Sequence, residues 1–329
     1  MKRLIIGIAL AAILMLSNLR LGRGQDAEPV PGTTATVPPP SNPLQVALLK
    51  WYPANRTTLF TVGANPEALA FDGVSIWVAN AGSSTLTKLR ASDGATLGTF
   101  GLPSGPVALA FDGANVWAAM NSINSVAKVR ASDGTVVGTF TVGSNPISLA
   151  FDGSNIWVVC GFNSVSKLYA GNGKVLGTFR VGDQPFAVAF DGANVWVANN
   201  ASNNVSKLRA SDGKTLGTFN VGNSPWDAAF DGANIWITNT GDDTVTKLRA
   251  SDGATLGTFT VPATEPQSVA FDGANIWVAN FISNDVTALR ASDGKVLGTF
   301  KVGTNPFGVA FDGANIWVAN SISNTVSKL

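Results

Sequence analysis

The chain has 329 residues, of which 45% are hydrophobic and 13% are charged, and its formal net charge is +1. This composition supports a sizeable core, and so small a net charge indicates no particular class of partner. The sequence contains no histidine and only one cysteine, which excludes histidine-based catalysis and an intrachain disulfide.

Residues 1–24 have the pattern of a secretory signal peptide. Two cations precede an apolar run over residues 4–16, which is short for a membrane-spanning helix, and residues 22–24 form a small-x-small cleavage site. Arginines after the run are unusual in a signal, so an uncleaved anchor remains the alternative. Residues 25–43 are rich in Pro, Thr and Ser and are expected to form an extended linker. We therefore predict an exported protein that is periplasmic, secreted or on the cell surface.

Residues 44–329 contain one motif seven times. The tripeptide Phe-Asp-Gly recurs every 39 to 41 residues, and a tryptophan stands six residues after each Phe. The phenylalanines are Phe71, Phe111, Phe151, Phe190, Phe230, Phe271 and Phe311, and the tryptophans are Trp77, Trp117, Trp157, Trp196, Trp236, Trp277 and Trp317. A period near 40 residues built from short β-type runs is typical of propeller blades. The sequence therefore predicts an all-β, seven-bladed β-propeller.

Each repeat predicts four antiparallel strands. In the last repeats, these are expected at residues 297–302, 308–311, 315–319 and 325–329, with Asp-Gly turns between strands. The seventh repeat stops after its third strand, whereas residues 58–63 form an unpaired fourth-strand sequence before the first repeat. We expect these two to pair and close the ring. Residues 48–51 also resemble a third strand, and whether they pair is left open.

The repeated aromatic and acidic residues are expected to serve the fold. A tryptophan on a central strand, flanked by Ile or Val, should pack between adjacent blades. The aspartate of each Phe-Asp-Gly should cap its own turn.

The repeat resembles a known family. Ile-Trp-Val-Ala-Asn, Ser-Asn-Thr-Val-Ser-Lys-Leu and Gly-Val-Ala-Phe-Asp-Gly in the last repeat are similar to the YVTN-type repeat of YncE-like seven-bladed propellers. The wider group includes NHL-repeat proteins and streptogramin lyases. This resemblance covers about residues 44–329 and implies the fold. Family members include surface-layer components, secreted binding proteins and a few enzymes. The lyases use a catalytic histidine and a metal held by acidic groups, and a chain without histidine cannot carry that chemistry over.

The seven copies differ mainly on one face, which we call the variable face. It carries the loops between second and third strands and the loops between blades, whereas the opposite turns are nearly identical. The variable loops contain seven acids and no Lys or Arg, which argues against nucleic-acid binding. The acids are Glu67, Asp183, Asp227, Asp242, Asp243, Glu265 and Asp285.

Repeats five and six concentrate acidic and aromatic residues on this face. Such a cluster suits a divalent cation, a polyamine or a Lys- or Arg-bearing segment, and the alternative is a solubilising rim. The candidate ligand-binding residues are Trp226, Asp227, Asp242, Asp243, Glu265, Phe281 and Asp285, and a metal would be held by Asp227, Asp242 and Asp243. We identify no catalytic residue, and Cys160 is expected to be a tolerated, half-buried thiol.

The sequence therefore favours a non-enzymatic, exported binding or adhesion scaffold, expected to be monomeric, that presents the variable face to a protein, glycan or cationic ligand. One alternative is a structural component of the cell envelope or a surface layer. A second is a metal-dependent enzyme of the lactonase or lyase type.

Overall fold

The structure is a computed structural model that describes residues 57–329. The predicted signal peptide or anchor, the linker and the strand-like residues 48–51 lie outside the described residues. Between residues 57 and 329, no helix is both long and apolar enough to cross a bilayer.

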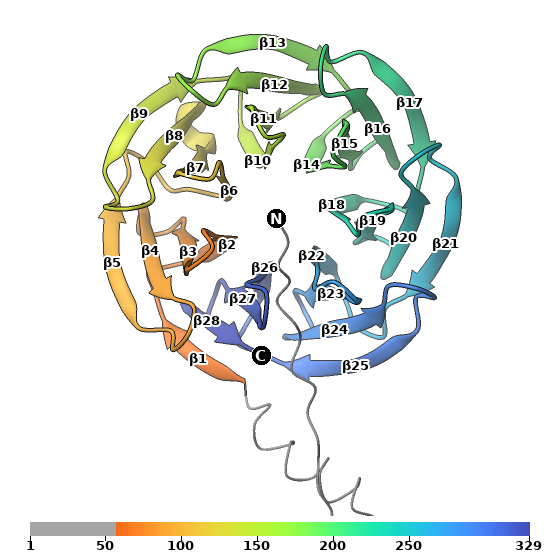
Figure 1. The fold of residues 1–329 in the computed structure, drawn as a ribbon. Coiled ribbons are helices and arrows are strands. Elements are labelled where there is room, and N and C mark those ends of the chain that lie inside the picture. The colour runs from red at the N-terminus through yellow and green to blue at the C-terminus, as the bar shows by residue number, and fades with distance from the viewer. Residues whose placement is uncertain (1–56) are drawn as a thin grey trace, which may run out of the picture. The chain divides into compact units, whose positions relative to one another are not determined.

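Seven four-stranded antiparallel sheets are arranged around a central channel, as predicted (Figure 1). Blade 1 consists of β2 (Pro66–Phe71), β3 (Ser75–Asn80), β4 (Thr85–Arg90) and β5 (Thr96–Gly101). Blade 2 consists of β6 (Ala108–Phe111), β7 (Asn115–Met120), β8 (Ser125–Arg130) and β9 (Val136–Thr141). Blade 3 consists of β10 (Pro146–Phe151), β11 (Asn155–Cys160), β12 (Ser164–Tyr169) and β13 (Val175–Arg180). Blade 4 consists of β14 (Pro185–Phe190), β15 (Asn194–Asn199), β16 (Asn204–Arg209) and β17 (Thr215–Asn220). Blade 5 consists of β18 (Pro225–Phe230), β19 (Asn234–Asn239), β20 (Thr244–Arg249) and β21 (Thr255–Thr260). Blade 6 consists of β22 (Pro266–Phe271), β23 (Asn275–Asn280), β24 (Asp285–Arg290) and β25 (Val296–Lys301). Blade 7 consists of β26 (Pro306–Phe311), β27 (Ile316–Asn320), β28 (Thr325–Lys328) and β1 (Thr58–Thr61), and the described chain adds one short 3-10 helix, η2 (Asn121–Ile123).

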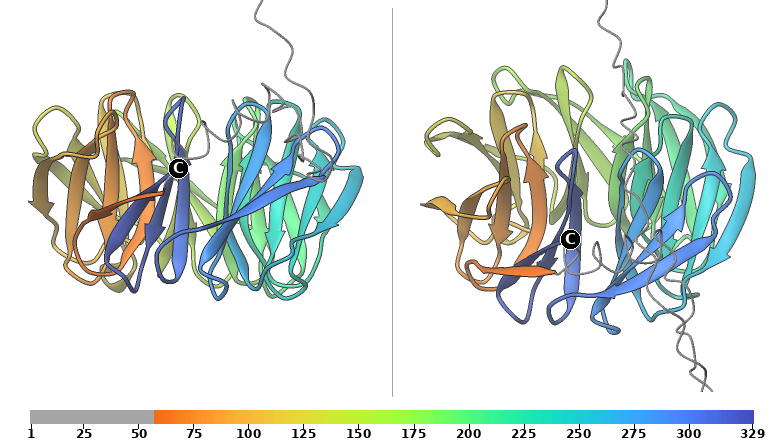
Figure 2. Two further views of the ribbon diagram at one scale, coloured as in Figure 1. Left: turned by 90° about the horizontal axis from the view of Figure 1, so that it is seen from below. Right: turned by 60° about the horizontal axis from the view of Figure 1, so that its bottom comes forward.

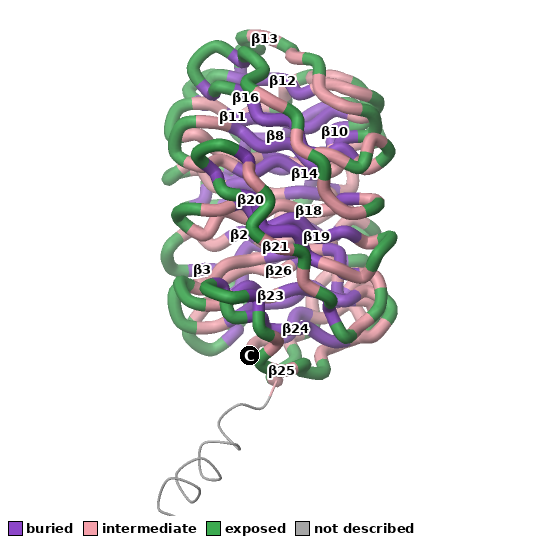
Figure 3. Tube along the Cα trace, turned by 90° about the vertical axis from the view of Figure 1, so that its right-hand side faces the viewer, coloured by how far each residue is buried: buried purple, intermediate pink, exposed green. Residues whose placement is uncertain are grey.

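The outermost strand of blade 7 comes from the beginning of the described chain. Strand β1 pairs antiparallel with β28, from Thr58 opposite Lys328 to Thr61 opposite Thr325. This pairing is consistent with the predicted ring closure. The strands run between two opposite faces, and the side view in Figure 3 shows buried residues in the band between the faces, with exposed loops at both faces (Figures 2 and 3).

The second strand of each blade supplies the core. Six of the seven repeat tryptophans are fully buried, and Trp277 is partly exposed. Each indole packs against a phenylalanine of the outermost strand, with ring centroids 5.4–5.6 Å apart. The turn glycine of the next blade covers that ring, because a Cβ at Gly134 (φ +76°) would collide with Phe100. The predicted packing role of the tryptophans is confirmed.

Each Phe-Asp-Gly aspartate caps its turn, as expected, and also holds its tryptophan. In blade 2, Asp112 Oδ1 accepts hydrogen bonds from the backbone N–H groups of Ala114 (2.9 Å) and Asn115 (2.6 Å). Its Oδ2 accepts a hydrogen bond from Trp117 Nε1 at 2.8 Å. Equivalent indole bonds of 2.7–2.8 Å occur in all seven blades. These seven carboxylates therefore serve the scaffold.

A lysine on the third strand links each blade to the next in six of the seven blades. Lys128 Nζ lies 5.2 Å from the Trp117 ring and donates to the carbonyl oxygen of Ala170 at 2.6 Å. Blade 6 has Ala288 at this position, and its Trp277 is the partly exposed one. The outer strand of blade 7 is β1 and not a continuation of β28, so among residues 57–329 no turn between a third and a fourth strand supplies an accepting carbonyl in this blade. The missing lysine therefore coincides with a missing acceptor.

Candidate functional site

The variable-face end of the central channel is shaped by irregularities in the innermost strands. Each blade begins its first strand with a proline or just after one, and in most blades the residue after that proline is skipped in the pairing register. Glu67 is skipped in this way between Pro66 and Ala68. Blades 5 and 6 each leave two residues unpaired, Trp226 and Asp227 in blade 5 and Gln267 and Ser268 in blade 6. A bulge frees a side chain from the ladder and redirects it, so these residues are free to line the channel.

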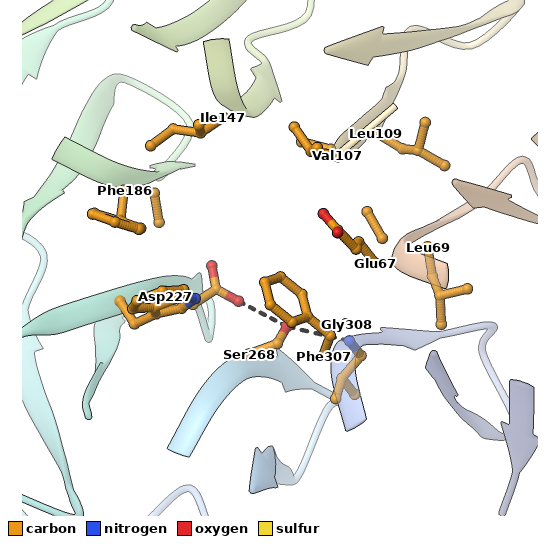
Figure 4. Close-up of a pocket in the computed structure, with 15 residues that line it drawn as sticks. Glu67, Leu69, Val107, Leu109, Ile147, Phe186, Asp227, Ser268, Phe307 and Gly308 are labelled. Carbon is orange, nitrogen blue, oxygen red and sulfur yellow. Dashed lines mark hydrogen bonds between the residues drawn. The ribbon is translucent and has the colours of Figure 1, made fainter. Parts of the chain in front are cut away.

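These residues enclose a cavity of ≈ 180 Å³, which we call the channel mouth (Figure 4). Its lining includes two carboxylates, Glu67 and Asp227, that come from blades on opposite parts of the ring. Aromatic rings from blades 4, 5 and 7 and aliphatic side chains, mostly from blades 1 to 3, make much of the rest of the wall. The aromatic lining residues are Phe186, Trp226 and Phe307, and the larger aliphatic ones are Leu69, Val107, Leu109, Ile147 and Val309.

The aromatic side chains form a continuous row across blades 4 to 7. The Phe186 and Trp226 ring centroids are 4.4 Å apart, and Trp226 meets Phe307 edge-on at 6.4 Å. Phe281, in a loop of blade 6, contacts Phe307 edge-on at 6.1 Å. The predicted candidates Trp226 and Phe281 therefore belong to one aromatic row, which Phe186 and Phe307 complete.

Asp227 is held in a hydrogen-bond network that joins blades 5, 6 and 7. Its Oδ2 accepts from Ser268 Oγ (2.8 Å) and the Val269 N–H (2.9 Å), and its Oδ1 accepts from the Ala228 N–H (2.8 Å). Ser268 Oγ in turn accepts from the Val309 N–H at 3.2 Å. Burial raises the pKa of Asp227, and the three hydrogen bonds only partly oppose that effect.

Thr238, on the second strand of blade 5, hydrogen-bonds to the residues of the bulge. Its Oγ1 accepts a hydrogen bond from the Asp227 N–H at 3.0 Å and donates one to the carbonyl oxygen of Gln267 at 2.6 Å. In the other blades this position is Ala or Val, so Thr238 is a departure from the repeat that a comparison of the copies could have identified. Sequence reasoning missed both Thr238 and Ser268.

Glu67 is the less constrained carboxylate of the mouth. Among residues 57–329 its side chain has no hydrogen-bond or ion-pair partner, and Figure 4 shows its carboxylate turned toward the centre of the cavity. Burial raises its pKa to about 7. At neutral pH this carboxyl group is therefore divided between its protonated and ionised forms.

Gln267 lies at the equivalent position of blade 6 and is 5% exposed. Its Oε1 is buried, and no hydrogen-bond partner for it occurs in the described part of the chain. A buried amide oxygen without a partner is uncommon in folded proteins. The aromatic contact of Trp226 with Phe307 spans blades 5 and 7, on either side of the Gln267 blade.

The remaining predicted acidic residues lie outside the cavity lining: Asp242, Asp243 and Glu265 are in loops, and Asp285 is the first residue of β24. Both Asp242 oxygens accept hydrogen bonds from Asn223, at 2.6 and 2.7 Å, and Asp243 Oδ1 accepts from the Glu265 N–H at 2.9 Å. Asn and Ser make the same bonds in other blades, as Asn203 does to the Ser224 N–H. These aspartates therefore perform loop functions that neutral residues perform elsewhere in the ring.

The carboxylate of Asp285 also has partners within the protein. It is 5% exposed, accepts from Asn280 Nδ2 at 2.9 Å and pairs with Lys301 Nζ at 2.9 Å. The same lysine donates to the carbonyl oxygen of Ser283 in the adjacent loop. Lys301 thus neutralises one of the acids expected to make this face negative.

The candidate metal ligands do not come together as a set. Asp227 lines the channel mouth, whereas Asp242 and Asp243 lie in a loop with their own partners. In the portion of the chain that the structure describes, no group of three His, Cys, Asp or Glu residues could hold a metal ion. Cys160 is fully buried rather than half-buried, and burial raises the pKa of its thiol.

The chain matches no protein-family model and no curated protein sequence. It is similar in structure to a chain of Kuenenia stuttgartiensis hydrazine synthase, with a TM-score of 0.73, 18% identity, and coverage of 80% of this chain and 95% of that one. It is also similar to virginiamycin B lyase from Staphylococcus aureus, with a TM-score of 0.71, 17% identity, and coverage of 83% and 98%.

A further similar structure is a catalytically inactive histidine-to-alanine variant of that lyase with quinupristin, at a TM-score of 0.70, 18% identity, and coverage of 83% and 99%. Identities this low demonstrate a shared fold and nothing about activity. The fold is consistent with the sequence resemblance to YncE-like and NHL-repeat propellers. By its geometry and these likenesses, the chain is a seven-bladed β-propeller with four-stranded blades.

Proposed function

We propose that this chain is a non-enzymatic, exported binding scaffold whose variable face receives a ligand at the channel mouth. The ligand would be a protein, a glycan or a cationic ligand. One observation carries the proposal: the channel mouth combines two carboxylates of raised pKa with a row of aromatic rings. Pockets with an apolar wall and a few convergent polar groups are the usual form of a ligand site.

The contrast between the scaffold and the mouth supports this proposal. The repeated aspartates, tryptophans and lysines satisfy one another within or between blades, as in the Asp112–Trp117–Lys128 set. The mouth residues differ from blade to blade, and Glu67 has no side-chain partner among the described residues. A polar group left without a partner in a desolvated cavity is more stable when a ligand provides one.

The proposal is tested by thermal-shift and calorimetric titration of the full chain with cationic, neutral and anionic probes, including spermidine, lysine-containing peptides and oligosaccharides. A ligand at 100 times its dissociation constant should stabilise the fold by about 2.7 kcal/mol. Trp226→Ala should remove the response. Phe162→Ala is the matched control, because Phe162 is an exposed aromatic residue in a loop of blade 3 outside the mouth. Equal loss in both variants, or no response to any probe, would contradict the proposal.

The alternative of a structural envelope component has one observation in its favour. Each outermost strand carries at least one exposed Leu or Val, which gives a belt of apolar side chains around the ring: Leu59, Leu97, Val136, Val137, Val175, Leu176, Leu216, Leu256 and Leu297. Such a belt would suit lateral contacts between rings in an array. Sedimentation of the full chain over a range of concentrations separates the two functions, because ordered assemblies would favour the structural role.

The enzyme alternative rests on Glu67. A carboxyl group with a pKa of about 7 in a partly apolar cavity is suited to general acid–base chemistry. Turnover of a lactone probe that Glu67→Gln abolishes would replace the binding proposal with a catalytic one.

A further inference from the structure

The chemistry of the channel mouth allows the ligand group to be specified more narrowly. We infer that the mouth binds an alkylammonium group, primary or N-methylated, on an unbranched stem, with Glu67 as the counter-ion and the Trp226 aromatic row as the cation-binding wall. The inference rests on the proposed binding function.

The lining favours an organic cation over a metal ion. Calcium requires about six to eight oxygen ligands, and zinc requires nitrogen, sulfur or carboxylate ligands in a tetrahedral set. The mouth lining contains two carboxylates, and the oxygens of the Asp227 carboxylate already accept three hydrogen bonds from the protein. Aromatic rings do not ligate such metals, but they attract an ammonium group over their faces within about 6 Å. The wall therefore selects a cation that has apolar character.

The mouth offers few free hydrogen-bond acceptors, which favours binding of an ammonium group over binding of a guanidinium group. A guanidinium carries five N–H donors, and a primary ammonium carries three. Glu67 is the lining carboxylate whose oxygens remain free within the described chain, so a buried guanidinium would retain unpaired donors. Such donors are costly once they are removed from water. Each N-methyl group removes a donor and adds apolar surface, so methylation should strengthen binding.

The opposite wall of the mouth is suited to a methylene stem. Blades 1 to 3 contribute Leu69, Val107, Leu109 and Ile147. The cavity of ≈ 180 Å³ is smaller than the roughly 300–1,000 Å³ of sites that enclose a whole drug-sized ligand. It therefore holds the end group and a short stem, and the remainder of a longer ligand would lie on the variable face. A free amine and a lysine side chain share this chemistry.

The acidic loops around the mouth would attract such a ligand. Asp183 and Glu265 lie in loops of the variable face, and no salt bridge to either carboxylate occurs in residues 57–329. Asp183 is exposed and Glu265 is half-buried. Charges at the rim of a site raise association rates and act more weakly on affinity. Glu67 inside the mouth and Glu265 in the loop therefore have separable roles.

The test is isothermal titration of the full chain at pH 8 with four probes of similar size: butyltrimethylammonium, butylamine, butylguanidinium and 1-pentanol. We expect affinity to decrease in that order, and quenching of Trp226 fluorescence, measured against Trp226→Phe, should locate the site. Glu67→Gln should weaken the ammonium probes at least tenfold while leaving 1-pentanol unchanged. Glu265→Gln, the matched control, should change the affinity less than twofold. Because Glu67 has no described side-chain partner, its amide variant should retain the wild-type circular dichroism and melting behaviour at this pH or gain stability.

Two further arms identify the source of the ammonium. A lysine or trimethyl-lysine peptide that binds at least tenfold more tightly than butylamine indicates a protein ligand, and the reverse order indicates a free amine. Either result supports the inference. Guanidinium or pentanol binding as tightly as ammonium would overturn the inference, although a glycan or peptide response lost in Trp226→Ala would leave the binding function standing. No response to any ligand would overturn both.

Discussion

Two aspartates four residues apart in blade 5 show how differently this protein uses one side chain. Asp231 caps the repeated turn, accepts from Trp236 Nε1 at 2.7 Å and also accepts from the Ala233 and Asn234 N–H groups. Burial alone would raise the pKa of Asp231, but these hydrogen bonds outweigh it and lower the pKa. At Asp227 in the channel mouth, burial prevails and the pKa is raised. In the repeated turn the protein itself stabilises the ionised carboxylate, whereas in the mouth burial disfavours the ionised form, which a cationic ligand would stabilise.

The largest effect is expected from breaking a repeated turn. Asp112→Ala should destabilise the fold by about 3 kcal/mol, because it removes the acceptor of the Trp117 indole and of two backbone N–H groups, each lost bond to a buried donor costing about 1–3 kcal/mol. Urea denaturation measures the change. Asp133→Ala, in an exposed ion pair of the same blade, is the control and should cost well under half as much. Equal losses would contradict the structural role assigned to Asp112.

The second prediction concerns pH, where the two regions have opposite signs. Because the folded pKa of Glu67 is raised from 4.5 to about 7, its contribution to stability is complete below pH 4.5 and is lost as the pH rises through 7. The lowered pKa values of turn aspartates such as Asp112 and Asp231 give stability that is present above pH 3.8 and is lost as the pH falls further. Glu67→Gln should therefore stabilise the protein at pH 8 by about 1–2 kcal/mol, after allowance for solvent screening, and by almost nothing at pH 4.

The same titration should control ligand binding. Asp227 is the other titratable residue in the mouth lining, and its raised pKa acts in the same direction. With a pKa of about 7, the ionised fraction of Glu67 is roughly ten times greater at pH 8 than at pH 6. Affinity for butyltrimethylammonium, measured by calorimetry, should rise by about that factor over this interval. A flat profile in the wild-type protein would exclude Glu67 as the counter-ion.

A smaller effect is expected from the serine that connects the mouth to the next blades. Ser268→Ala removes a hydrogen bond to Asp227 and the acceptor of the Val309 N–H, and should cost about 1–2 kcal/mol. Ser148 makes the corresponding bond to the Val188 N–H at 3.3 Å and has no aspartate partner, so Ser148→Ala should cost about half as much. Differential scanning calorimetry of the two variants compares them directly. The reverse order would mean that the Asp227 network adds no stability.

The smallest effect tests the blade that lacks its lysine. Ala288→Lys restores the repeat residue, but the described residues of blade 7 offer no turn carbonyl to accept a hydrogen bond from its ammonium group, so stability should change by less than about 0.5 kcal/mol. Lys128→Ala is the reference, because it removes an existing bond to Ala170 and the contact with Trp117. A clear gain of melting temperature in Ala288→Lys would show that the lysine contributes through the ring contact alone.

Much of the architecture was predictable because its determinants are local and repeated. The predicted strands at residues 297–302 and 308–311 correspond to β25 (Val296–Lys301) and β26 (Pro306–Phe311), with small shifts at the ends. The Phe-Asp-Gly turns, the buried tryptophans and the pairing of residues 58–61 with the last repeat follow from a period of about 40 residues. Seven copies of one pattern give seven concordant predictions, which is why the fold was recognisable without an aligned relative.

The channel mouth was only partly predictable. Trp226 and Asp227 were identified from acidity and aromatic character, and both line the cavity. Asp242 and Asp243 were chosen on the same grounds, yet they hold loops together, as neutral residues do in other blades. Glu67 was recognised as an acid of the variable face but was not selected as a site residue, since it stands alone in blade 1. The acids of repeats five and six lie close together in the sequence, and for that reason the prediction gave them too large a part in the binding site.

The sequence by itself determined the ring, the blade count and the capping chemistry, since each depends on contacts that recur at a fixed spacing. Only the tertiary structure decided which variable residues meet, because three blades lie between Glu67 and Asp227 along the chain, and the two residues converge only when the ring closes. It also decided their ionisation, since burial in the shared cavity raises both pKa values. Desolvation depends on what surrounds a group in three dimensions, and no local pattern encodes it.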